Sequence, residues 1–107
     1  MKQTLTLLMI MLLSNAQFAV AASRAEAGKA KAVVCAACHG IDGNSQVPTM
    51  YPSLAGQSSD DLQTKLKAYR EGKGSGPMAA TMVAMAKPLS DQDIAELAAY
   101  FSQQNKR

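Results

Sequence analysis

The spacing of hydrophobic residues predicts two amphipathic helices in the C-terminal half of the chain. The clearer one follows Ser90, a suitable N-cap, and has acidic residues in its first turn. Its apolar residues recur at i, i+3, i+4 and i+7, namely Ile94, Leu97, Ala98 and Phe101. The other helix begins at Ser58 or Ser59 and ends near Gly72. Its apolar stripe, at spacings of four and three, consists of Leu62, Leu66 and Tyr69.

A third helix is expected nearer the N-terminus, from about Arg24 to Ala37, where alanine and lysine predominate. Gly28 and Ala32 lie four residues apart and share one face, so another helix could approach closely there. Residues 40–57 and 73–78 are rich in glycine and proline and are predicted to be loops. No segment alternates polar and apolar residues as a strand does, and we therefore predict an all-α fold.

The first 22 residues have the layout of a secretory signal peptide. Lys2 gives a positively charged start, residues 5–13 are apolar apart from Thr6, and small residues occupy 19–22. The apolar run is shorter than the roughly 20 residues that a membrane-spanning helix needs. A retained membrane anchor is the alternative. We expect export, removal of residues 1–22 by cleavage after Ala21 or Ala22, no stable membrane insertion afterwards, and one domain of residues 23–107.

Charge gives little support for a nucleic-acid partner. The formal net charge is +3 and falls to +2 once the predicted signal segment, with its one lysine, is removed. The basic residues are scattered and are not interleaved with the few aromatic residues. A domain of this size buries only about 60% of its unfolded surface. Because the chain also has few large apolar side chains, an additional group is expected to fill its core.

Cys35, Cys38 and His39 form a Cys-Ala-Ala-Cys-His sequence, which is the attachment signature of a c-type haem. Two thiols separated by two residues can each form a thioether with one porphyrin vinyl group, and the adjacent histidine then reaches the iron. A disulfide would close a small, strained ring, and a thioredoxin-like pair would need a βαβ pattern. A zinc site would need more ligands, yet His39 is the only histidine. One covalently bound haem c also accounts for the small apolar core.

The sixth iron ligand cannot be a second histidine of this chain. The mature chain offers four methionine sulfurs, those of Met50, Met78, Met82 and Met85. Met50 is close in sequence to His39 and lies between two prolines, so it is poorly placed for the opposite face of the ring. The other three lie between Pro77 and Pro88, in a stretch that can wrap around that face. Because methionine is often core filler, the residues alone leave the choice among these three open.

The mature chain resembles the small class I mono-haem cytochromes c of bacteria, including single domains of their di-haem relatives. The resemblance spans the whole mature chain and is carried by four stretches in a fixed order: residues 34–40, 42–44, 51–57 and 89–101. It implies three to five helices packed around one covalently bound haem, with the first and last helices crossing near Gly28 and Tyr100.

The resemblance also implies roles for individual residues of the site. The ligand methionine of the family commonly lies seven residues before the leucine that opens the last-helix motif, and from Leu89 this spacing selects Met82. The carbonyl group of Pro52 is expected to accept a hydrogen bond from Nδ1 of His39, which would leave Nε2 for iron.

The implied function is that of a soluble periplasmic electron carrier, not an enzyme. An iron with both axial positions filled has no place for a substrate, and thioether ligation favours ferrous iron. One alternative is a haem enzyme or gas sensor with an open distal site, and another is the haem subunit of a larger redox enzyme. A peroxide site needs a distal acid–base group, but Arg70 is the only arginine between the first helix and Arg107. The expected partners are redox proteins that dock transiently on a monomer.

Overall fold

The computed structural model describes residues 2–107, with the side chains of all of these except residues 2, 3, 5 and 14. Every regular element in that range is helical, which confirms the predicted all-α class. The elements are α1 (Lys2–Lys31), the 3₁₀ helix η1 (Ala32–Cys35), α2 (Ala36–His39), α3 (Ser59–Arg70), α4 (Ala79–Ala86) and α5 (Asp91–Ser102).

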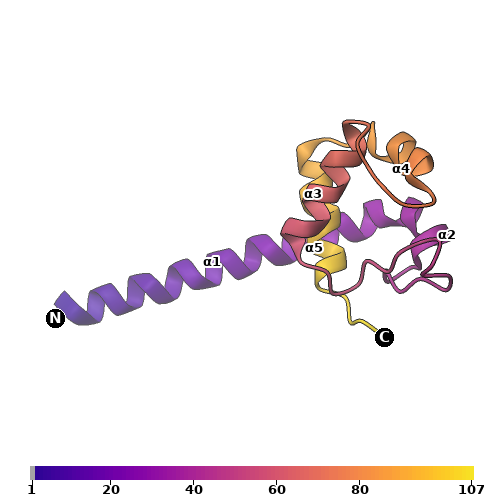
Figure 1. The fold of residues 1–107 in the computed structure, drawn as a ribbon. Helices are drawn as coiled ribbons and strands as arrows, with labels where there is room; N and C mark the ends of the chain where they lie inside the picture. The colour runs from indigo at the N-terminus through magenta and orange to yellow at the C-terminus, as the bar shows by residue number, and fades with distance from the viewer. Residues whose placement is uncertain (1) are drawn as a thin grey trace.

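Helix α1 is much longer than the predicted helix of residues 24–37. It starts at Lys2, and its N-terminal part projects away from the rest of the molecule (Figure 1). From Lys31 the chain continues through η1 and α2 as far as His39. By length and composition alone, the stretch Thr6–His39 could cross a membrane, and a signal sequence near the N-terminus has the same properties.

The predicted N-caps of α3 and α5 are confirmed. Ser58 caps α3, because its Oγ accepts a hydrogen bond from the Asp61 amide at 3.1 Å. Ser90 caps α5 in the same way, accepting from the Asp93 amide at 3.0 Å. The Asp93 side chain in turn accepts from the Ser90 amide at 2.9 Å, which completes a capping box. These local bonds fix where both helices begin.

Helix α4 was not predicted as a helix. Gly76 and Pro77 precede it and indicate a loop, and Met78 at its N-cap position makes no side-chain cap. Its first turn contains no acidic residue, and its sequence has no polar face to contrast with an apolar one. This helix is therefore stabilised by packing and not by its local sequence. It lies against α3, and Ala86 at its end is completely buried.

The core lies where α5 packs against both α1 and α3. The largest fully buried side chain is that of Ile94, and the rings of Tyr100 and Phe101 meet edge to face with centroids 5.0 Å apart. At the crossing, Gly28 lies directly against the backbone of Glu96. A Cβ atom at residue 28 would overlap the Glu96 carbonyl group and come within 2.9 Å of Cβ of Tyr100. The predicted crossing of the first and last helices near Gly28 and Tyr100 is therefore confirmed.

Gly28→Ala is expected to destabilise the folded protein by about 2 kcal/mol, because the added methyl group must push α1 away from α5. The matched control is Ala30→Ser, on an exposed position of the same helix, which should change the free energy of unfolding by less than about 0.5 kcal/mol. Urea unfolding of the haem-loaded variants measures both values. Equal midpoints for the two variants would show that the close approach at residue 28 does not matter.

An ion-pair network joins the same two helices three residues further along α1. The Lys31 ammonium group lies 2.5 Å from Oδ1 of Asp93 and also binds the Glu96 carboxylate. Glu96 is buried, and it accepts a second hydrogen bond from Gln92 at 2.9 Å. The Lys31 bond, assisted by the Ser90 amide, lowers the pKa of Asp93 from 3.8 to about 2. Because that pKa is depressed by folding, charged Asp93 stabilises the folded state.

Asp93→Asn should lower the urea midpoint at neutral pH, while the asparagine can still accept the Ser90 amide hydrogen bond. The folded-state pKa lies below the unfolded value, so the stabilisation is complete above about pH 5 and is lost as the pH falls from about 4 towards 2. The difference between the wild-type and variant midpoints should follow this course. A difference that is constant from neutral pH to pH 2 would contradict the assignment.

Candidate functional site

The Cys-Ala-Ala-Cys-His segment lies on the two short helices that follow α1. Cys35 is the last residue of η1 and packs against the hydrophobic core, while Cys38 and His39 lie on α2. No disulfide joins the two cysteines. Burial, with a contribution from the neighbouring Cys38, raises the pKa of the Cys35 thiol. Both cysteines and the histidine therefore lie on one helical segment that follows directly from α1. Because α1 packs against α5, the position where this segment begins is fixed.

His39 is held by a backbone group. Its side chain is only 6% exposed, and Nδ1 lies 2.6 Å from the carbonyl oxygen of Pro52. This is the hydrogen bond that the sequence resemblance implied. The hydrogen bond of the His39 side chain among the described residues is made by Nδ1, so Nε2 is the nitrogen available to a metal.

The loop that carries the Pro52 carbonyl is itself fixed by hydrogen bonds. The carbonyl of Gly43 accepts from the amides of Leu54, at 2.7 Å, and Ala55, at 3.1 Å. The Gln57 side chain donates to the Ser53 carbonyl at 2.6 Å, so residues on both sides of Pro52 are anchored. The orientation of the His39 ring thus depends mainly on backbone groups of this loop.

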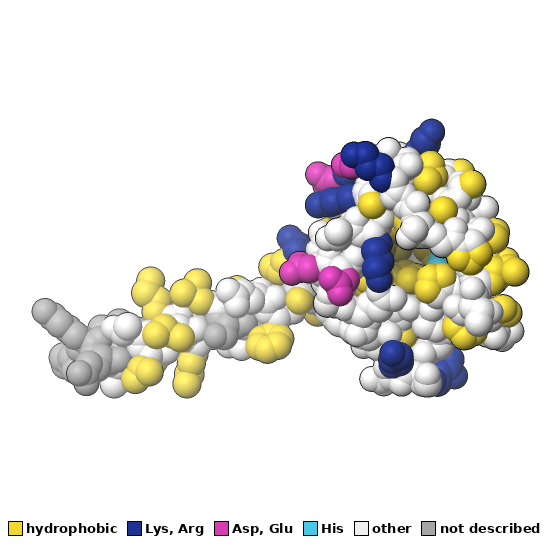
Figure 2. All heavy atoms as spheres, in the orientation of Figure 1, with side chains coloured by type: hydrophobic (Ala, Val, Ile, Leu, Met, Phe, Trp, Pro, Cys, Tyr) yellow, Lys and Arg dark blue, Asp and Glu magenta, His cyan; other side chains and the backbone are white. Residues whose placement is uncertain are grey.

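Met82 lies on α4, in the segment between α3 and α5, and the structure places it near His39. Its side chain is half-buried, as is that of Met78 at the start of α4. Met85 and Met50 are 41% and 44% exposed. In Figure 2 the only histidine, in cyan, is visible at the bottom of a hollow that is bordered by hydrophobic atoms.

These residues fit a covalently attached haem. The two thiols are not joined to each other, the histidine presents a free Nε2, and the hollow around it is apolar (Figure 2). Within the described part of the chain no three His, Cys, Asp or Glu side chains gather as ligands for a bare metal ion. The donor set instead suits an iron that brings its own porphyrin nitrogens.

Two side chains of α3 also reach the segment that carries Met82. The Tyr69 hydroxyl donates to the Ser75 carbonyl at 2.7 Å. The Arg70 guanidinium donates to the Leu89 carbonyl at 3.1 Å and to Oδ1 of Asp91 at 2.7 Å. The sequence marked Tyr69 only as part of an apolar stripe and gave Arg70 no structural role, since hydrogen bonds over such separations leave no local signal.

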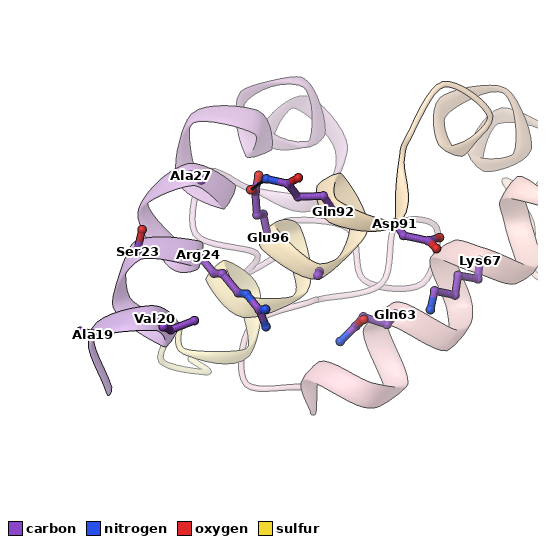
Figure 3. A pocket seen from close by; sticks show the side chains of 11 residues that line it. Ala19, Val20, Ser23, Arg24, Ala27, Gln63, Lys67, Asp91, Gln92 and Glu96 are labelled. Carbon is purple, nitrogen blue, oxygen red and sulfur yellow. Dashed lines mark hydrogen bonds between the residues drawn. The ribbon is translucent and has the colours of Figure 1, made fainter. Parts of the chain in front are cut away.

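A cavity of about 770 Å³ lies elsewhere, between α1, α3 and α5. Figure 3 shows Arg24 and Gln63 extending towards each other across it. The residues that line this cavity do not include the candidate site residues, which are Cys35, Cys38, His39 and Met82. Part of its wall is Ala19 and Val20, which belong to the predicted signal segment, so it is not the candidate site.

Comparison with known proteins agrees with this geometry. Residues 25–105 match the family described as Cytochrome c. The chain belongs to the cytochrome c family. It is 51% identical over 83 residues to cytochrome c-554(548) of Halomonas halodenitrificans, covering 78% of this chain and 99% of that one. It is also 36% identical over 85 residues to cytochrome c-553 of Nitratidesulfovibrio vulgaris, covering 79% of this chain and 83% of that relative.

Cytochrome c4 is a longer relative. The chain is 47% identical over 90 residues to cytochrome c4 of Stutzerimonas stutzeri, covering 78% of this chain and only 42% of that protein. The crystal structure of reduced recombinant cytochrome c4 from Pseudomonas stutzeri superposes with a TM-score of 0.67 at 44% identity. That match covers 78% of this chain and 46% of the other, so the chain corresponds to less than half of cytochrome c4.

The family assignment confirms several of the predictions from the sequence. The fold is that of a small class I cytochrome c, and the cofactor is a covalently bound c-type haem. The protein is an electron carrier and not an enzyme, as its small mono-haem relatives indicate. An electron carrier exchanges electrons with other redox proteins, so such proteins are its partners.

Proposed function

We propose that this cytochrome c is a soluble periplasmic carrier whose haem is attached through Cys35 and Cys38 and whose iron is bound by His39 and Met82. The observation that carries the proposal is the 2.6 Å contact between Nδ1 of His39 and the Pro52 carbonyl. It fixes the tautomer, orients the ring and leaves Nε2 as the donor to iron. When bound, the haem supplies a one-electron ferric–ferrous couple.

Burial and position support Met82 as the second axial ligand. Its side chain is half-buried on α4 and near His39, whereas Met85 and Met50 are more exposed, at 41% and 44%. Met78 is also half-buried, but it lies at the N-cap of α4, one turn away from Met82. A thioether favours ferrous iron and raises the reduction potential relative to a second histidine. With both axial positions filled, the site passes electrons and has no position for a substrate.

Met82→Ala is expected to abolish the weak sulfur-to-iron absorption band at the red end of the ferric spectrum and to open the iron to carbon monoxide in the ferrous state. Met85→Ala, on the same helix but exposed, is the matched control and should keep the band. Absorption spectra of both oxidation states, recorded for the wild type and for both variants, test this.

Two results would assign the distal side differently. A band that survives Met82→Ala but disappears in Met78→Ala would make Met78 the ligand. A high-spin wild type that binds carbon monoxide readily would instead favour the gas sensor or enzyme with an open distal position.

Export and processing are part of the proposal. The N-terminal part of α1 is an apolar, signal-like helix that projects from the folded body (Figure 1). Its exposed apolar side chains belong to residues 1–22, whereas the site uses only residues after 30. Cleavage would therefore remove the apolar segment without touching the site. The remaining domain would act as a monomer that docks briefly on its redox partners. It would not stay inserted in the membrane, and it would not bind nucleic acid.

The intact mass of the protein purified from the periplasm should correspond to a chain starting at Ala22 or Ser23 plus one haem, because cleavage follows Ala21 or Ala22. The haem mass should persist under denaturing conditions, since thioethers hold it. Cys35→Ser and Cys38→Ser should each retain at most one thioether, and the double variant should lose its haem on denaturation. A full-length mass recovered from the membrane fraction would mean that the segment is an anchor.

A further inference from the structure

We propose that Tyr69 and Arg70, adjacent residues at the end of α3, are positioning residues that hold the two ends of the segment carrying Met82. This inference rests on the proposed ligation of iron by Met82. It is carried by the pattern of hydrogen bonds around residues 74–89. Within the described residues, that segment receives hydrogen bonds from the rest of the protein at only two points, one at each end.

Tyr69 holds the beginning of the segment. Its hydroxyl group donates to the carbonyl of Ser75 at 2.7 Å. Its ring lies against Gly74, where a Cβ atom would overlap the ring carbons. The hydrogen bond and the ring contact together fix the path of the chain as it leaves α3 and turns towards α4.

Arg70 holds the end of the segment. One nitrogen of its guanidinium group donates to the carbonyl of Leu89 at 3.1 Å, and another donates to Oδ1 of Asp91 at 2.7 Å. Leu89 is the last residue before the cap of α5, and its side chain packs against the core. The planar guanidinium therefore ties the end of the segment both to α3 and to the start of α5.

The remaining bonds of the segment are internal. The Met82 amide donates to the Met78 carbonyl at 3.0 Å, and the Leu89 amide donates to the Ala86 carbonyl at 3.0 Å. Among the described helices, α4 packs substantially only against α3. The position of α4, and with it the sulfur of Met82, is therefore set from α3.

The physical consequence is a higher local concentration of the thioether at the iron. An intramolecular ligand competes with free ligands in solution in proportion to its effective concentration, which falls when its tether is loosened. Holding both ends of a sixteen-residue segment limits how far Met82 can move away. Releasing either end should leave the sulfur bound but easier to displace.

Imidazole titration of the ferric haem-loaded protein tests this, because imidazole binds iron only where it displaces the methionine. Arg70→Gln and Tyr69→Phe should each raise the imidazole association constant about fivefold, as expected for one hydrogen bond of ordinary net strength. The double variant should show a larger increase than either. Arg70→Lys keeps the charge but not the two-pronged contact, and should fall between Arg70→Gln and the wild type.

Arg107→Gln is the matched control. It breaks an arginine–carboxylate contact of 2.8 Å with Asp42, which lies outside residues 74–89. Its imidazole affinity should stay within about twofold of the wild type. The sulfur-to-iron band should be present in every variant before imidazole is added, which shows that Met82 is still bound.

The possible results separate the two proposals. Affinities of Arg70→Gln, Tyr69→Phe and the double variant that all match Arg107→Gln would overturn the positioning role while leaving Met82 as ligand. A wild type without the sulfur-to-iron band, or with an imidazole affinity equal to that of Met82→Ala, would overturn the ligation and this inference with it.

Discussion

The close crossing of α1 and α5 is the contact on which the rest of this structure depends. Gly28 has no side chain, so the backbone of Glu96 can lie directly against it. Lys31 then binds two carboxylates of α5 and fixes the register of the two helices. Because α1 continues into the segment of Cys35 and His39, and α5 begins just after the segment of Met82, one contact relates both sides of the haem site.

The two sides are held by different kinds of group. The His39 side depends on backbone carbonyls and amides of residues 40–57, such as the Pro52 carbonyl and the bonds to Gly43. On the Met82 side, two side chains of α3 bind the ends of the segment that carries this methionine. A covalently attached haem with a fixed histidine needs a rigid loop, whereas a weak thioether ligand needs only to be kept nearby. In the proposed ligation, His39 is thus oriented by its loop, whereas Met82 is held in place from α3.

Local chemistry made much of this predictable from the sequence. The caps at Ser58 and Ser90 and the Cys-Ala-Ala-Cys-His sequence act within a few residues, so their patterns are visible in the chain itself. Helix α4 was missed because its formation depends on packing against α3 and not on caps or an amphipathic pattern. The Lys31 and Arg70 contacts were missed for a related reason, since they join residues that are 62 and 21 positions apart. Proposing Met82 as the iron ligand needed the family resemblance. Met82 is more buried than Met85, but this difference cannot be predicted from the sequence alone.

The separation of the two sides also determines how such a carrier can change. Substitutions in residues 40–57 alter backbone bonds that orient His39, and so affect haem attachment and folding together. In the proposed arrangement, substitutions at Tyr69 or Arg70 instead loosen the segment that carries Met82, and those at Arg70 also break the contact with Asp91. Because thioether ligation favours ferrous iron, a loosened methionine stabilises the ferric state relatively and lowers the reduction potential. In the proposed arrangement, the end of α3 is therefore the place where the potential can be adjusted without disturbing the covalent attachment at Cys35 and Cys38.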